Sequence, residues 1–520
     1  MTQGLPLAAL ALATMLYAGS SGAVRAEDRI LQISAGGSDI STLDAHRASA
    51  TTDKALVGWM YNGLVRFPPG SADPKDIEPD LAERWESSPD SKTWTFYLRK
   101  GVKFHGNRGE LTADDVVYSL TRSADPKRSS FSADFAGVDS ITRVDDSTVR
   151  IALKYADPNF LGRVSNYHGG NIVSKKAAEE LGDKFGAAPV GTGPFAFAEN
   201  VTQQYVKLVA HDGYFRGRPK IDTIMYRLIP SDSARELAFT SGELDVMYAK
   251  REQRWVDAAR KRGNMTVDIF RPGEFRTLHI NRTVAPLDDV RVRQAIAHAI
   301  NVDDLVRFVG RDVGPKGCSV VPPGYLGEDC SMGSYAYDAA KAKALLAEAG
   351  HPNGITLKVT VSNISSQLPI MEIIQSQLGK VGIKLDMNVV DHPTYHSQIR
   401  KDASALVFYG AARFPIADTY LSEFYHSAAT IGKPTAVANF SHCAVADAEI
   451  EAARAEANPY KQVALWIEAQ RKIKEDVCAV PLFELLQVWA HSSRVDFGYA
   501  LKGAMNLAPP ITEATTIAPR

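Results

Sequence analysis

The sequence predicts an α/β protein with more than one domain. The clearest evidence is a strand, a helix and a strand in succession, formed by TLKVTVS (356–362), IMEIIQSQLGKVG (370–382) and IKLDMNVV (383–390). Apolar residues alternate in the first and third segments and recur at helical spacing in the second, which indicates a crossover between parallel strands. The chain has 520 residues, a length that predicts about two to four domains.

Composition and charge are those of a globular protein. Hydrophobic residues make up 45% of the chain and charged residues 23%. The 59 basic and 60 acidic residues are interspersed, with a net charge of -1. This even distribution argues against a groove for nucleic acid or another polyanion.

The first half alternates strands with helices. The expected strands are RILQIS (29–34), TWTFYLRKGVKF (93–104) and STVRIAL (147–153), and a polar loop of unusual length follows the first of them. The segment LTADDVVYSL (111–120) predicts a helix, with Thr112 as N-cap and Asp115 three residues later. The segment SARELAFTSGELDV (233–246) predicts a second helix, which Gly242 would end.

The second half predicts longer helices and the parallel sheet. VRVRQAIAHAINVDDLVRFV (290–309) and YDAAKAKALLAEAG (337–350) have the pattern of amphipathic helices, and Gly350 ends the latter. ALVFYG (405–410) is expected to add a third strand after the crossover.

The strand ends of this sheet predict a ligand site. Ligands of open parallel sheets collect outside the carboxyl ends of the strands. Those ends lead into Asn363, into DHPTYH (391–396) with Tyr395 and His396, and into GAARF with Arg413. Arg413 is therefore a candidate for binding an anion, and the alternative is that a carboxylate elsewhere in the fold pairs with it.

Motifs for other chemistry are absent or out of context. GTGPFA (191–196) matches a dinucleotide pattern, but Pro194 and the alternation after it predict a turn and a strand rather than a helix. His392 and His396 have a spacing seen in metal sites, yet Pro393 argues against a helix there. No hydrolase or phosphate-loop motif is present, so we expect binding rather than catalysis, with no cofactor and no metal.

The four cysteines predict two disulfides in an oxidising compartment. Cys318 and Cys330 bracket a loop rich in proline and glycine, and Cys443 and Cys478 would form the second pair. Four cysteines allow three pairings, so locality alone favours this one.

The N-terminus resembles an export signal. LPLAALALATMLYA (5–18) is an apolar run of signal-peptide length, and Val24 and Ala26 suit the small-residue positions before a cleavage site. We expect a signal peptide over 1–26 and a mature protein in the periplasm. The alternative is a membrane anchor, but the run is shorter than the roughly 20 residues that span a bilayer.

Four stretches together resemble family 5 of the bacterial extracellular solute-binding proteins, the dipeptide-, oligopeptide- and nickel-binding proteins of ABC importers. They are LAERWESSPDSKTWTFYLRKGVKFHGNRGELTADDVVYSL (81–120), PVGTGPFAF (189–197), DVRVRQAIAHAIN (289–301) and YDAAKAKALLAEAG (337–350). The resemblance covers nearly the whole mature chain, in order.

The resemblance implies a fold and a role. The fold is the two-lobed periplasmic binding protein fold, which closes on its ligand by hinge motion. The first lobe would comprise 27–271 with 486–520, and the second lobe 272–485. The role would be that of a monomeric, non-enzymatic receptor that delivers a small solute to an ABC permease and its ATPase.

Arg413 departs from the family pattern. Peptide-binding relatives have an aspartate at this position, where it holds the ammonium group of the peptide. A guanidinium repels an ammonium and attracts a carboxylate or phosphate. The expected solute is therefore a peptide-like or opine-like conjugate with an anionic group. The alternatives are a phosphorylated sugar conjugate of the agrocinopine kind and, from another class, a secreted hydrolase.

The resemblance implies further ligand-facing residues in the first lobe. HRASATTDK (46–54) corresponds to a segment that reaches the ligand and contains Ser49. AGGSD (35–39), with Ser38, offers backbone amides to an anion or forms an ordinary turn. SNYHGGNIV (165–173) is a ligand-binding segment or a glycine-rich turn, and its candidate residues are Tyr167, His168, Gly169, Gly170 and Asn171.

Overall fold

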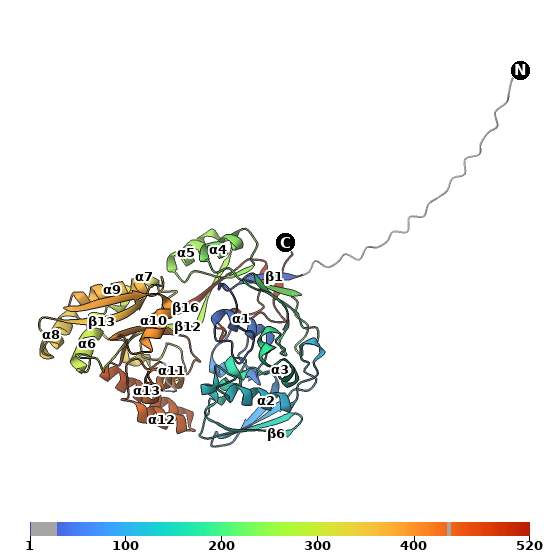
Figure 1. The fold of residues 1–520 in the computed structure, drawn as a ribbon, viewed down its shortest axis with the longest axis horizontal. Helices are drawn as coiled ribbons and strands as arrows, with labels where there is room; N and C mark the ends of the chain where they lie inside the picture. The colour runs from blue at the N-terminus through green and yellow to red at the C-terminus, as the bar shows by residue number, and fades with distance from the viewer. Residues whose placement is uncertain (2–28, 434–437, 520) are drawn as a thin grey trace.

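The computed structural model describes Met1 and residues 29–433 and 438–519 (Figure 1). Residues 2–26 of the expected signal peptide, and the expected mature start near Glu27, lie outside the described residues. Within the described ranges, no helix combines the length and the apolar character that crossing a bilayer requires.

One mixed sheet of eight strands runs through the molecule. Its spatial order is β15 (Leu406–Ala411), β12 (Thr266–Ile280), β16 (Ala479–His491), β11 (Val246–Tyr248), β1 (Ile30–Ser34), β10 (Thr223–Arg227), β9 (Tyr205–Ala210) and β8 (Phe195–Val201). The long strands β12 and β16 are antiparallel neighbours, with Thr266 opposite His491 and His279 opposite Ala479. In Figure 1 they lie between two groups of elements.

The first group, here called the first body, is held by a core drawn from both ends of the chain. Its core residues run from Leu31 to Phe270 and then from Trp489 to Ile517. Besides β1 and β8–β10 it contains α1 (Thr51–Met60), β2 (Val65–Arg66), β3 (Glu78–Pro79), β4 (Ala82–Ser87), β5 (Thr93–Leu98), α2 (Ala113–Ala124), β6 (Val138–Asp145), β7 (Thr148–Leu153), α3 (Lys175–Leu181), β17 (Val495–Asp496) and β18 (Thr516–Ile517).

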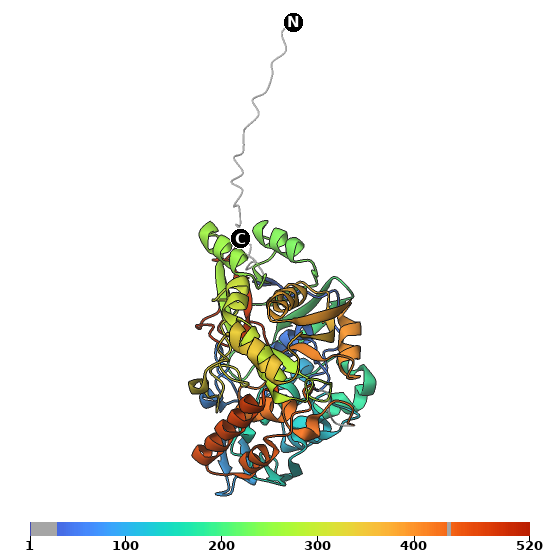
Figure 2. The ribbon, with the colours of Figure 1, turned by 90° about the vertical axis from the view of Figure 1, so that its left-hand side faces the viewer.

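The second group, the second body, has two core clusters, one from Ala238 to Ala490 and one from Phe275 to Ala479. Figure 2 turns its yellow-to-red helices toward the viewer, in front of the blue and cyan first body. Its elements are α4 (Asp232–Thr240), α5 (Gln253–Arg262), α6 (Val290–Ala299), α7 (Val302–Val309), α8 (Ala339–Glu348), β13 (Ile355–Ser362), α9 (Leu368–Gly379), β14 (Ile383–Val390), α10 (His392–Ile399), α11 (Ala417–Phe424), α12 (Asp447–Ala455) and α13 (Pro459–Asp476).

The expected lobe boundaries fall inside the two long strands. The junctions 271/272 and 485/486 lie in β12 and β16 respectively. However, α4 and α5 contribute Ala238, Phe239 and Trp255 to a core cluster of the second body, although both helices precede residue 271. The boundaries therefore remain a prediction.

Local signals in the sequence predicted several elements correctly. The predicted crossover forms β13, α9 and β14, and its two strands are parallel over their whole length. The helix α2 begins with the expected capping box, in which the Thr112 amide donates to Asp115 Oδ2 at 3.0 Å. RILQIS and STVRIAL form β1 and β7.

Three expectations were wrong. The segment 290–309 is two helices, α6 and α7, because the chain is extended at Ile300 and Asn301 caps the second helix. Pro393 does not prevent a helix, since it occupies the first turn of α10, where no intrahelical N–H is needed. The strand β15 pairs with β12, and the β13–β14 pair remains a separate two-stranded sheet.

Both expected disulfides are present, Cys318–Cys330 and Cys443–Cys478. The first closes the loop before the turn at Cys330–Met332, on the surface. Cys443 and Cys478 are both fully buried in the core cluster that begins at Phe275. The second disulfide therefore joins segments of the second-body core.

Candidate functional site

Arg413 lies just beyond the end of β15 and is held by a carboxylate. Its Nε and Nη2 atoms donate to the two oxygens of Glu423, each at 2.5 Å, and Glu423 lies on α11. The alternative expected from the sequence, a carboxylate partner within the fold, is therefore present. Burial opposes the charge of this arginine, but the attraction of Glu423 outweighs it and raises the pKa of Arg413.

The ion pair leaves part of the guanidinium available. Arg413 has five N–H donors, of which two bind Glu423 and one, on Nη1, binds the Ala412 carbonyl at 3.1 Å. In addition, the Tyr325 hydroxyl donates to the Arg413 carbonyl at 3.1 Å, which fixes the backbone. The remaining two N–H groups have no protein acceptor among the described residues.

Side chains of the first body approach Arg413 from across the junction. The charge of Arg413 acts on Lys54, Asp134, Tyr167 and His168. We call these four residues and Arg413 the interface cluster. Its members come from α1, two short turns and the loop after β15, so neither body contains the cluster alone.

Phe414 places the loop after β15 against the first body. Its ring centroid lies 5.8 Å from that of Phe67 and 6.4 Å from that of Tyr167. A Cβ on Gly162 would come within 2.1 Å of the Phe414 ring, so this glycine makes room for it. A separate contact joins the bodies where Asn159 donates to Gln462 at 2.9 Å.

His168 is a neutral histidine with one unused nitrogen. Its ring is stacked between Phe131, at 4.1 Å, and Tyr167, at 3.6 Å, and its Nδ1 lies 3.7 Å from Asp134 Oδ2. Burial, and after it the charge of Lys54, lower its pKa to about 3. The Nε2 atom is buried without a partner in the described structure. It is therefore available to a ligand hydroxyl or carboxylate.

Lys54 adds a second cation to the interface cluster. Burial, and after it the like charge of Arg413, lower its pKa to about 8. No hydrogen bond or ion pair to its ammonium is found among the described residues. Lys54 was not among the residues predicted from the sequence, although it lies at the end of the segment HRASATTDK.

Gly169, Gly170 and Asn171 support the site rather than line it. A Cβ on Gly170 would lie 2.2 Å from the Ser165 carbonyl, and one on Gly169 would lie 2.7 Å from the Phe135 ring. These glycines admit neighbouring protein, which is not the close approach to a ligand that we expected. Asn171 is fully buried, and its amide donates to the His168 carbonyl at 2.9 Å.

The other predicted residues lie apart from the interface cluster. Ser38, Ser49 and Asn363 have exposed side chains. Tyr395 is buried and donates to the Phe408 carbonyl at 2.6 Å, while His396 contacts His392 at 3.1 Å between their Nε2 atoms. No hydrogen bond or ion pair of the described residues joins any of these five to the interface cluster.

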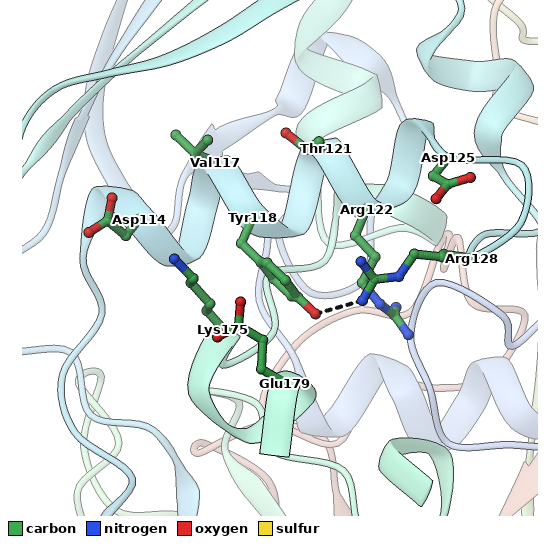
Figure 3. A pocket seen from close by; sticks show the side chains of 9 residues that line it. All are labelled: Asp114, Val117, Tyr118, Thr121, Arg122, Asp125, Arg128, Lys175 and Glu179. Carbon is green, nitrogen blue, oxygen red and sulfur yellow. Dashed lines mark hydrogen bonds between the residues drawn. The ribbon is translucent and has the colours of Figure 1, made fainter. Parts of the chain in front are cut away.

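A shallow hollow of about 330 Å³ lies on α2, in the first body (Figure 3). Three basic and three acidic residues line it, and the Arg128 guanidinium donates to the Tyr118 hydroxyl at 2.8 Å. Its residues are Asp114, Val117, Tyr118, Thr121, Arg122, Asp125, Arg128, Lys175 and Glu179. Its charges balance and it contains no residue of the interface cluster, so we do not assign it a ligand.

One group of metal-ligating side chains occurs in the described ranges, formed by Cys318, Glu328 and Cys330. Its two cysteines are joined in a disulfide. Metal binding requires thiolates, so this group is not a metal site.

Comparisons with known proteins agree with this architecture. The model of the family described as bacterial extracellular solute-binding proteins, family 5, middle, matches residues 76–431. The dipeptide-binding protein of Escherichia coli K12 is 32% identical over 365 residues, which span 65% of this chain and 67% of that protein.

Two solved structures are similar over almost the whole chain. The periplasmic binding protein MoaA from A. tumefaciens R10, in complex with mannopinic acid, is 48% identical with a TM-score of 0.85, and the match covers 94% of this chain and 100% of that one. AgaA from the same bacterium, in complex with agropinic acid, is 26% identical with a TM-score of 0.78, and the match covers 94% and 99%. The two-lobed periplasmic binding protein fold is thereby confirmed. The chain belongs to family 5 of the bacterial extracellular solute-binding proteins.

Proposed function

We propose that this protein captures an opine-type solute, an amino-acid conjugate with an anionic group, between its two bodies and delivers it to an ABC importer. The observation that carries the proposal is the 48% identity, over 94% of the chain, to a protein solved with mannopinic acid. The receptor binds its solute without changing it.

The interface cluster supports this solute class. Arg413 is fixed by Glu423 and keeps two N–H donors, and Lys54 supplies a second positive charge, on which Asp134 acts without forming a hydrogen bond or ion pair. Neutral His168 presents Nε2, which suits the hydroxyl groups of a sugar-derived part. A free ammonium group would meet the cations of Arg413 and Lys54. The nearby carboxylates already have partners, since Glu423 binds Arg413 and Asp134 acts on Lys54 and His168, so we expect peptides with a free amino terminus to bind weakly.

Calorimetric titration with mannopinic acid tests the proposal. We expect tight, saturable binding, and we expect a dipeptide with a free amino terminus to bind at least about a hundredfold more weakly. Mass spectrometry of the released solute should show it unchanged. Absence of binding would overturn the proposed solute, and preference for a phosphorylated sugar conjugate would support the alternative solute class. Turnover would support the hydrolase.

The proposal includes export and a membrane partner. Residues 1–26 are expected to be removed on export, and the mature monomer is expected to dock on the permease. Mass spectrometry of protein isolated from the periplasm should give a mature start near Glu27. Uptake of labelled mannopinic acid should be lost in cells that lack the gene and restored by the full chain.

A further inference from the structure

A second group of buried charges lies where β12 enters the second body. We call Arg251, Glu274 and Arg276 the hinge group. Glu274 and Arg276 are two residues apart on β12, so their side chains leave the same face of the sheet. Arg251, between β11 and α5, donates through Nη1 to Glu274 Oε1 at 2.9 Å, and Arg276 donates through Nη2 to Oε2 at 2.5 Å.

The hinge group carries more positive than negative charge. Two guanidiniums share the single carboxylate of Glu274. The next acid that acts on Arg251 is Asp232, and Arg235 already binds it. Burial opposes the charge of Glu274, but Arg251 and Arg276 outweigh this and lower its pKa to about 2. One uncompensated positive charge therefore remains in a mostly buried place, which is costly unless an anion joins it.

Arg276 is also incompletely bonded. Only 3% of this residue is exposed, and its Nε atom is buried without a hydrogen-bond partner in the described structure. Leaving a buried donor unpaired is unfavourable, and more so when the group is charged. The guanidinium lies on Gly410, where a Cβ would come within 2.6 Å of Nη1, so β15 has a glycine at the one position that admits this side chain.

Neutral groups border the hinge group on the side of α10. Burial, and after it the charge of Arg276, lower the pKa of His392. Burial, and after it His392, lower that of His396 to about 4. His392 bonds Ser362 Oγ at 2.9 Å through Nδ1, and the ring of His396 lies 6.0 Å from that of Tyr409. The two Nε2 atoms lie 3.1 Å apart, and Arg400, a cation just after α10, donates to His396 Nδ1 at 3.0 Å. All four ring nitrogens therefore already have partners.

We propose that Arg251 and Arg276 form an anion subsite that binds a carboxylate of the solute, in addition to the interface cluster. Gly410, which touches Arg276, is three residues before Arg413 on the same chain segment, so both positions lie at one end of β15. The inference rests on the proposed function for the identity of the solute only. A solute that occupies both the hinge group and the interface cluster has at least two groups that each bind a cation or a hydrogen-bond donor.

Replacing Glu274 distinguishes an anion subsite from an ion pair that is only structural, because the two predict different changes in affinity for the solute. If a carboxylate of the solute binds the two guanidiniums, Glu274 competes with it, and Glu274→Gln should tighten binding of mannopinic acid several-fold. Arg276→Gln should weaken it at least about tenfold, the loss typical of one charge-assisted hydrogen bond. Arg276→Gln still leaves Glu274 paired with Arg251, so the variant should fold.

The matched control is Arg260→Gln, which removes one arginine from the exposed face of α5, where it pairs with Asp312. Its affinity for mannopinic acid should equal that of the native protein. Equal affinities of native, Arg276→Gln and Glu274→Gln proteins would overturn the subsite and leave the proposed function intact.

A probe that does not depend on the solute is glutarate, with neutral glutaramide as its counterpart at equal ionic strength. Glutarate should raise the melting temperature of the native protein more than glutaramide does, and Arg276→Gln should remove the difference. If this occurs while mannopinic acid does not bind, the subsite stands and the proposed solute falls. A difference that survives in Arg276→Gln would locate the carboxylate elsewhere and refute the inference.

Discussion

Arg413 is already held in place by a carboxylate of the protein. A free arginine side chain loses rotamer entropy when it binds an anion, whereas Glu423 already fixes this one through two hydrogen bonds. We expect Arg413→Ala to weaken solute binding about ten- to a hundredfold. Arg413→Lys should recover only part of the loss, because an ammonium cannot form the paired contacts with Glu423.

Calorimetry on both Arg413 variants measures this effect. Arg29→Lys is a suitable control, because Arg29 donates through Nε and Nη2 to the two oxygens of Asp222 in the first body. Unchanged affinity in Arg413→Ala would mean that the guanidinium only anchors α11.

His279 makes the protein sensitive to acid. Its ring is 2% exposed among Phe424, Tyr425 and Phe440, Nδ1 has no partner in the described structure, and burial lowers its pKa from 6.5 to about 3. The unfolded chain therefore takes up a proton near pH 6.5 that the folded protein takes up only near pH 3. As the pH falls through this window, the free energy of unfolding decreases by about 1.4 kcal/mol per pH unit from this residue.

His279→Phe should remove that contribution. Urea unfolding at pH 7.5 gives the effect of the substitution on packing alone. The variant should then lose less stability than the native protein between pH 6 and pH 4.5. Parallel pH dependence of the two proteins would show that His279 does not titrate on unfolding.

At the scale of elements, the two disulfides should contribute unequally. Cys318–Cys330 closes a segment with a sequence separation of 12 at the surface, whereas Cys443–Cys478 closes a separation of 35 in the core. Loop-closure entropy gives about 3 kcal/mol for a short loop and more for a longer one. Replacing both buried cysteines by serine also places two hydroxyls in an apolar core, which adds to the loss.

Urea unfolding of the two double serine variants measures the difference. Double alanine variants serve as controls for the hydroxyl groups. Equal midpoints for the two pairs would contradict the expected ranking.

Elements with a strong local signal were predictable from the sequence, and long-range partners were not. Capping residues and apolar periodicity fixed α2 and the β13, α9, β14 unit. Local pattern does not specify which strand lies beside β15, because that pairing forms between residues more than a hundred positions apart.

The same limit applies to the site. Arg413 was singled out by its place after a strand and by its departure from the aspartate of the family, yet Glu423 reaches it from the last turn of α11. Lys54 and the hinge group gave no local signal, since ordinary charged residues become notable only when burial and distant neighbours are known. Tyr167 and His168 were predicted through the resemblance, and the charge of Arg413 acts on both.

At the scale of the molecule, Phe414 is expected to hold the two bodies together. Its ring belongs to the second body and contacts the rings of Phe67 and Tyr167 in the first body. Phe414→Ala should favour more open conformations, so the radius of gyration of the free protein should increase and the solute should dissociate faster. Small-angle X-ray scattering and stopped-flow kinetics measure the two effects.

Phe308→Ala provides the control, because this phenylalanine is 58% exposed on α7. It should leave scattering and kinetics unchanged. Identical scattering of native protein and Phe414→Ala would show that other contacts, such as Asn159 with Gln462, maintain the closed arrangement.

The core of the first body includes Trp489, Val495, Phe497 and Ile511 from the C-terminal segment. A ribosome makes these residues after every residue of the second-body core except Ala490. Domains fold as units once their residues are available. The first body, although most of its residues precede the second body, therefore cannot complete its core until these C-terminal residues have been made, and the second body is the first to have a complete set of partners. The order of maturation is the reverse of the order of the sequence.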